Sequence, residues 1–144
     1  DSALIKSRRS LKRAFEDEYY LWALLSVAQW NPDFADSIEH LNLSKSYIDH
    51  IPDEITYLSN LKTLTLTHSG VKTLPERIGE LKELTHIYLG MSDVESLPSS
   101  MSKLTKLKYL NLYRAPIESK ETDLLAASLP NCRIVLYTTN LNYI

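Results

Sequence analysis

Cysteine and glycine are scarce in this chain, and their scarcity excludes several kinds of site. The 144 residues contain one cysteine, Cys132, so neither an internal disulfide nor a cysteine metal cluster can form. The three glycines, Gly70, Gly79 and Gly90, are too far apart to build a glycine-rich phosphate-binding loop. We therefore expect no cofactor and no metal.

The chain also lacks an excess of charge of either sign. Its 16 lysines and arginines nearly balance 18 aspartates and glutamates, which gives a formal net charge of -2. General binding to nucleic acid or to an anionic membrane surface needs a large excess of basic residues. We therefore expect no nucleic-acid partner.

Long apolar runs are missing as well. No stretch approaches the roughly 20 apolar residues of a transmembrane helix, and no charged-then-apolar leader precedes a small-residue cleavage site. We expect no direct membrane insertion, and nothing in the composition indicates a cellular compartment. With 144 residues, 44% of them hydrophobic, the chain is long enough to bury one continuous core.

Leucine and isoleucine, by contrast, recur at a fixed interval of 23 residues between residues 38 and 112. With repeats numbered from Ile38, Leu61, Leu84 and Leu107, positions 1, 4, 6, 11, 14, 18 and 21 are apolar throughout the first three repeats. A fixed period of this length is typical of a solenoid. In such a fold each unit buries its apolar side only by stacking on its neighbours.

The spacing within a repeat predicts one strand and one short helical turn. In Leu64, Thr65 and Leu66, as in the equivalent segments, apolar and polar residues alternate with period two, which indicates a short half-buried strand. Later in each of the first three repeats stands a proline, Pro52, Pro75 or Pro98, and the fourth repeat has Glu121 at that position. Proline favours the start of a helix, and the acidic or hydroxyl side chains that follow it suit the positive end of that helix.

These columns resemble the leucine-rich repeat family in its 23-residue form, whose pattern is LxxLxLxx(N)xLxxLPxxIxxL. The resemblance covers residues 38–137 and implies an α/β solenoid, a right-handed horseshoe arc with a parallel sheet on its concave side. The ninth position, usually an asparagine that bonds the turn backbone, is Ser46, Ser69, Ser92 and then Ala115. This departure weakens or replaces the asparagine ladder of the family.

The end of the array resembles the C-terminal cap of certain bacterial leucine-rich repeat proteins, in which a longer helix and an LPNCxIxF-type strand close the solenoid. Residues 121–128 are typical of a helix, residues 129–134 read LPNCRI, and Leu136 stands where that pattern has phenylalanine. Cys132 is therefore interpreted as a packing residue and not as a nucleophile. Residues 138–144 form a tail that would either cover the final strand or pair with another copy.

The first 37 residues stand outside the repeat and are predicted to form an amphipathic helical cap. Apolar residues recur there at helical spacing until Asn31 and Pro32 end the pattern. They include Leu4, Leu11, Phe15, Trp22 and Leu25. A solenoid leaves the apolar edge of its first repeat bare, so a terminal element must cover it. We expect that cover from Phe15, Trp22, Leu25 and Trp30.

A basic cluster in this helix offers an alternative. Lys6, Arg8, Arg9, Lys12 and Arg13 could bind an anionic lipid surface or nucleic acid. Nearby acidic residues nearly cancel their charge, namely Asp1, Glu16, Asp17 and Glu18. The cluster is therefore interpreted as a solvated helix face. The predicted organisation is a cap at residues 1–37, repeats at residues 38–137 and a tail at residues 138–144.

Strand alternation places positions 3, 5, 7 and 8 of each repeat outward on the predicted sheet, and we call these twenty positions the concave face. They are His40, Asn42, Ser44, Lys45, Thr63, Thr65, Thr67, His68, His86, Tyr88, Gly90, Met91, Tyr109, Asn111, Tyr113, Arg114, Arg133, Val135, Tyr137 and Thr138. None carries a carboxylate, whereas three carry a cation and four are tyrosines.

The C-terminal half of the concave face is the predicted partner-binding site. Tyrosine and arginine are enriched where proteins bind one another. The alternative is structural, because tyrosine and threonine favour strands and pack against their neighbours. The residues assigned to partner binding are His86, Tyr88, Tyr109, Asn111, Tyr113, Arg114, Arg133 and Tyr137.

Catalysis and metal binding receive little support. Neighbouring strands lie about 4.8 Å apart, so the backbones of His40 and His86 would stand roughly 10 Å apart, wider than adjacent zinc ligands usually allow. A metal bridged by His68 and His86 is the alternative. We expect no enzymatic activity, and we predict a module that binds a protein or peptide with an acidic contact surface.

The oligomeric state is not set by the sequence, and a monomer is favoured. The rival function is a structural or self-associating arm of a larger protein. Such an arm would make its contacts through the N-terminal helix or through the edge of the final strand.

Overall fold

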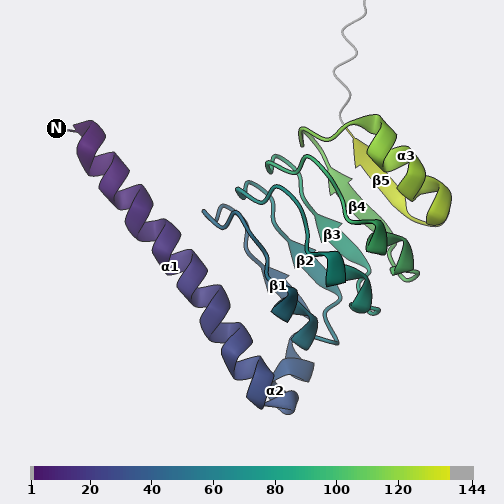
Figure 1. Ribbon diagram of the computed structural model, residues 1–144, viewed down its shortest axis with the longest axis horizontal. Coiled ribbons are helices and arrows are strands. Elements are labelled where there is room, and N and C mark those ends of the chain that lie inside the picture. The colour runs from purple at the N-terminus through teal and green to yellow at the C-terminus, as the bar shows by residue number, and fades with distance from the viewer. Residues whose placement is uncertain (1, 137–144) are drawn as a thin grey trace, which may run out of the picture.

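The computed structural model describes the backbone of residues 2–136 and the side chains of residues 16–136. Two helices precede an array of alternating strands and short helices, which a third helix and a last strand close (Figure 1). The order is α1 (Ser2–Trp30), α2 (Pro32–Ser37), β1 (His40–Asn42), η1 (Asp53–Tyr57), β2 (Thr63–Thr65), η2 (Glu76–Glu80), β3 (His86–Tyr88), η3 (Ser99–Lys103), β4 (Tyr109–Leu112), α3 (Ser119–Ser128) and β5 (Arg133–Leu136).

The five strands form one parallel sheet in the order of the chain, β1-β2-β3-β4-β5. Each strand pairs with the equivalent residues of the next repeat, so that Leu41, Leu64, Ile87, Leu110 and Ile134 align in one row. The first four of these side chains are buried. The inward leucine columns and the predicted parallel solenoid are therefore confirmed.

The short helices η1, η2 and η3 lie on the opposite side of the solenoid from the sheet (Figure 1). Each begins directly after one of the three recurring prolines and buries one apolar side chain, Ile55, Ile78 or Met101. Gly79 allows η2 and η3 to approach closely, because a Cβ there would lie 2.3 Å from the carbonyl oxygen of Ser100. The short helical turns predicted after Pro52, Pro75 and Pro98 are therefore present as η1, η2 and η3.

Helix α1 is continuous and caps the first repeat, but not with all the expected residues. Leu21, Leu25 and Ala28 are buried, whereas Trp22 is 42% exposed and Trp30 is 82% exposed. The side chain of Phe15 lies outside the described part. A helix turns about 100° per residue. Trp30 therefore lies roughly 200° around α1 from Ala28, and its expected role in the cap is wrong.

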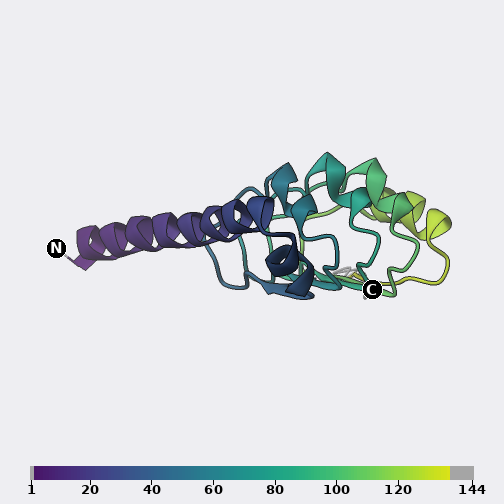
Figure 2. The same cartoon turned by 90° about the horizontal axis from the view of Figure 1, so that it is seen from below.

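A second contact fixes α1 to the first repeat. The carboxylate Oδ2 of Asp17 accepts a hydrogen bond from the backbone N–H of Tyr47 at 2.9 Å. The N-terminal part of α1 extends beyond the repeats as a rod (Figure 2). Within residues 2–136, no helix combines the length and the apolar character needed to cross a membrane.

The C-terminal cap has the predicted helix and strand. Helix α3 buries Thr122 and Leu125 and begins two residues earlier than expected, while β5 pairs with β4 along its whole length. Cys132 is half-buried and packs against the core, and this burial raises the pKa of its thiol. A raised pKa disfavours the reactive thiolate, which agrees with a packing role. Residues 137–144, including the predicted tail, lie outside the described residues.

The serines that replace the asparagine ladder behave differently from one repeat to the next. Ser92 donates from its hydroxyl to the carbonyl oxygen of Leu89 at 2.6 Å and accepts from the N–H of Val94 at 3.4 Å. The buried hydroxyls of Ser46 and Ser69 have no hydrogen-bond partner. The ladder is therefore complete at the third repeat and incomplete at the first two.

Candidate partner-binding site on the concave face

The register of the parallel sheet (Figure 1) aligns the outward residues in two rows that cross the strands. One row contains His40, Thr63, His86, Tyr109 and Arg133, and the other contains Asn42, Thr65, Tyr88, Asn111 and Val135. Neighbouring strands are about 4.8 Å apart, so consecutive members of a row are in side-chain reach. Seven of the eight predicted binding residues lie in or beside these rows, and Tyr137 lies outside the described residues.

Three rings from β3 and β4 form an aromatic cluster on this face. The ring centroid of Tyr88 lies 6.2 Å from that of His86 and 5.5 Å from that of Tyr109, and the rings of His86 and Tyr109 lie 6.1 Å apart. All three side chains are half-buried, so each keeps part of its surface in water. Contacts of this kind stabilise a pair of rings and hold them in fixed orientations.

Asn111 links this cluster to the loop that follows β4. Its Oδ1 accepts a hydrogen bond from the N–H of Tyr113 at 2.9 Å, and its Nδ2 lies 3.5 Å from the hydroxyl of Tyr109. Gly90 leaves the space for this amide, because a Cβ at that position would lie 3.1 Å from Oδ1. Asn111 therefore orients the turn that carries Tyr113.

A hydrogen bond holds the histidine of the cluster. Nδ1 of His86 lies 2.9 Å from the hydroxyl of Thr85, and this hydroxyl lies 3.1 Å from the carbonyl oxygen of Lys62. The hydroxyl has one proton and donates to only one of these two acceptors, and the tautomer of His86 decides which of them receives it.

The eighth residue of each of the first four repeats has a left-handed backbone, which the sequence did not indicate. Lys45, His68, Met91 and Arg114 have φ between 54° and 57°, and all four are exposed. The backbone N–H groups of Lys45, His68 and Met91 each donate a hydrogen bond to a carbonyl oxygen of the next repeat, which extends the backbone hydrogen bonding of the sheet. Glycine or asparagine would have signalled this conformation, but neither occupies these positions.

Arg114 completes the site from this left-handed position. Its guanidinium lies 5.4 Å from the centroid of the Tyr113 ring, within the range of a cation–π contact. Arg133 is exposed and pairs with Tyr109 across β4 and β5. The described residues of the concave face carry three cations, on Lys45, Arg114 and Arg133, and no carboxylate.

A groove lies at the edge of the concave face, along the loops that follow β1 to β3, and three residues of that face help to line it. Its volume is about 570 Å³, and it is lined by Lys45, Ser46, Tyr47, His68, Ser69, Gly70, Met91 and Asp93. The groove brings the cation of Lys45 together with the carboxylate of Asp93, so its charge is mixed. It does not include the aromatic cluster.

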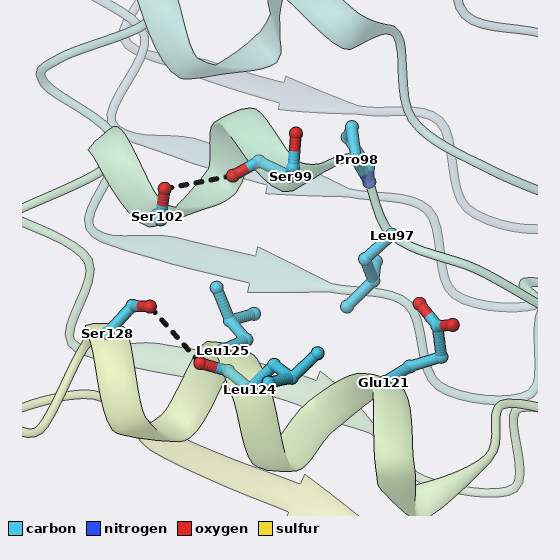
Figure 3. A pocket seen from close by; sticks show the side chains of 8 residues that line it. All are labelled: Leu97, Pro98, Ser99, Ser102, Glu121, Leu124, Leu125 and Ser128. Atoms are coloured by element: carbon cyan, nitrogen blue, oxygen red, sulfur yellow. Dashed lines mark hydrogen bonds between the residues drawn. The ribbon is translucent and has the colours of Figure 1, made fainter.

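A second cavity, of about 300 Å³, lies between η3 and α3 on the other side of the solenoid (Figure 3). Leu97 and Leu125 line its apolar part, and Glu121 lies at one end. Two of its hydroxyls donate to backbone carbonyls within their own helices, Ser102 to Ser99 at 2.9 Å and Ser128 to Leu124 at 3.1 Å.

Across residues 16–136, no group of three or more histidine, cysteine, aspartate or glutamate side chains could hold a metal ion. The alternative of a metal bridged by His68 and His86 thus finds no third ligand in that part of the chain.

Comparison with known proteins places this architecture in a family. The model of the leucine-rich repeat region matches residues 37–132. A leucine-rich repeat protein of Leptospira interrogans is 36% identical over 67% of this chain, with a TM-score of 0.65. An internalin of Listeria monocytogenes, 23% identical over 84% of this chain with a TM-score of 0.66, shares the fold.

Both of these bacterial proteins are much longer than this chain, which covers 25% of the first and 36% of the second. No curated protein matches the sequence. With two thirds of its residues within the family model and the parallel solenoid described above, the chain belongs to the leucine-rich repeat family.

Proposed function

We propose that this chain binds a protein or peptide through the C-terminal half of its concave face and that the contact surface of the partner is net acidic. Leucine-rich repeat proteins are in general binding modules and not enzymes. The observation that carries the proposal is the aromatic cluster of His86, Tyr88 and Tyr109, whose rings contact one another and still keep exposed surface.

The physical argument is preorganisation. Ordering flexible side chains opposes association, so a surface whose side chains are already held binds at lower cost. Ring contacts, the hydrogen bond from Tyr113 to Asn111 and the cation–π contact of Arg114 hold the site in place. Because the face carries cations and no carboxylate among its described positions, acidic partners are favoured electrostatically.

Selection from a random peptide library displayed on phage tests the proposal directly. Tyr109, Tyr113 and Arg114 stand at positions 3, 7 and 8 of their repeat and are replaced together by alanine. Loss of a few interface aromatic and arginine side chains typically costs 2 kcal/mol or more, so we expect the selected peptides to bind at least about thirtyfold more weakly.

The repeat design supplies a matched control. Thr63, Thr67 and His68 occupy the same three positions two repeats earlier, and their joint replacement by alanine should change affinity by less than about threefold. The selected peptides should be rich in aspartate and glutamate, and salt should weaken their binding. Equal binding to both triple variants, or selection of peptides without acidic residues, would contradict the proposal.

A further inference from the structure

Helix α1 has a surface that the solenoid leaves uncovered. Its C-terminal half packs on the first repeat through Leu21, Leu25 and Ala28, yet Glu18 and Trp22 remain exposed. Its N-terminal half runs on beyond the repeats, away from the sheet (Figures 1 and 2). A helix that projects in this way is available to a partner.

Six residues of α1 recur at intervals of alternately four and three, which is the heptad spacing of a coiled coil. Since α1 is one unbroken helix from Ser2 to Trp30, this spacing assigns the six positions to one stripe along it. They are Leu4, Arg8, Leu11, Phe15, Glu18 and Trp22. The stripe is apolar except for one cation and one carboxylate.

The stripe is also symmetric about residue 13. When a second copy of it is turned end for end, Leu4 falls opposite Trp22, Leu11 opposite Phe15 and Arg8 opposite Glu18. Every apolar residue then meets an apolar residue, and every charge meets the opposite charge. In a parallel alignment Arg8 would instead face Arg8, and Glu18 would face Glu18. Like charges in such a seam are unfavourable, so the antiparallel arrangement is selected.

We propose that α1 pairs antiparallel with α1 of a second copy of this chain through these six residues. The charges of the stripe support this occupant, because Arg8 of each copy faces Glu18 of the other. The seam from Leu4 to Trp22 is about 28 Å long at 1.5 Å per residue, which is short for a coiled coil. The dimer is therefore weak and depends on concentration.

This arrangement leaves the proposed partner-binding site free. Since the two helices run in opposite directions, the two solenoids lie at opposite ends of the pair. The concave faces do not take part in the seam, and a dimer presents two of them. The monomer expected from the sequence is replaced by this dimer at high concentration.

The full chain tests the proposal in the analytical ultracentrifuge, over a wide range of concentration. Arg8→Glu and Glu18→Arg each convert both opposite-charge pairs of the dimer into like-charge pairs, so each should weaken dimerisation about tenfold or more. The double variant R8E/E18R restores both pairs and should dimerise like the original chain. Within one helix these two residues lie ten positions, or about 15 Å, apart, so this rescue reports a contact between copies.

Arg13→Glu is the control, since it makes the same charge change about 180° around the helix from the stripe and should leave the dimer intact. Mixing the R8E and E18R variants should give a heterodimer, because every pair is then attractive. Circular dichroism confirms that each variant keeps its helix. A chain that stays monomeric at all concentrations would overturn the proposal. So would a dimer that R8E and E18R leave unchanged, or one that the double variant fails to restore.

Discussion

The two halves of the concave face share one scaffold and differ in what they display. We call the residues on β1, β2 and their loops the polar half, and those on β3, β4, β5 and their loops the aromatic half. Both halves stand on the same parallel sheet and the same buried leucine columns. The polar half carries short side chains such as Thr63 and Thr65, whereas the aromatic half carries contacting rings and a cation–π pair.

The two halves also differ in the hydrogen bonds that the serines of their turns make. Ser92, behind β3, has both of its hydroxyl hydrogen bonds, while the hydroxyls of Ser46 and Ser69, behind β1 and β2, have none. The aromatic half therefore has one serine with both hydroxyl hydrogen bonds, at Ser92, and Ala115 without a hydroxyl behind β4. In a repeat protein the core can stay constant while outward positions vary, so the two halves offer different surfaces on one core.

The largest expected effect tests whether the scaffold is truly common to both halves. Leu64 and Leu110 occupy the same position of their repeats in β2 and β4, and both are fully buried. Replacing either by alanine should cost about 3 kcal/mol of unfolding free energy, as is typical for a buried leucine. Urea denaturation followed by circular dichroism measures both losses. Values that differ by more than about 1.5 kcal/mol would show that the two halves have unequal cores.

The serine ladder gives a smaller and more discriminating comparison. Ser92→Ala removes a buried hydroxyl that donates and accepts, so we expect a loss of about 1 kcal/mol in unfolding free energy. Ser69→Ala removes a buried hydroxyl without a partner, so we expect no loss and a gain of up to about 1 kcal/mol.

The same denaturation experiment reads both serine variants, and the sign of the difference between them is the result. If Ser69→Ala were as destabilising as Ser92→Ala, the hydroxyl of Ser69 would have a partner in solution. The serine turns behind β2 and β3 would then no longer differ in their hydrogen bonding.

The 23-residue period made the buried core of the repeats predictable. Leucine columns that recur every 23 residues determine which strand residues are buried, and a strand with one buried face has only one register. The prolines before η1 to η3 and the LPNCRI segment before β5 signalled their elements locally. These elements could be predicted because the recurring residues, leucine in the strands and proline before the short helices, are also the residues that produce them.

The side-chain contacts on the concave face could not be predicted from the 23-residue period. Strand alternation predicts that Tyr88, Tyr109 and Asn111 point outward, but the ring contacts and the hydrogen bond from Tyr113 depend on side-chain conformations. Position 8 is left-handed at Lys45, His68, Met91 and Arg114, although none of these residue types favours that conformation. Trp30 was assigned to the cap from its hydrophobicity, although its position around α1 turns it to solvent.

The smallest expected effect concerns an ion pair of the polar half. Lys62 donates a hydrogen bond to Glu39 at 2.8 Å, and this bond together with the attraction of the ammonium lowers the pKa of Glu39 from its ordinary value of 4.5. A lowered pKa in the folded state means that ionised Glu39 stabilises the fold above pH 4.5, and that this contribution is lost as the pH falls through the lowered pKa.

Glu39→Gln isolates that contribution, because every other carboxylate titrates equally in both proteins. The original chain should be slightly more stable than the variant at neutral pH, and the difference should shrink to nothing in acid and at high salt, because both groups are exposed to solvent. Thermal unfolding of the two proteins over a pH series measures this difference. A gap that stays constant through the acid range would mean that the ion pair contributes nothing and that the polar half is held by its backbone ladder and leucine columns alone.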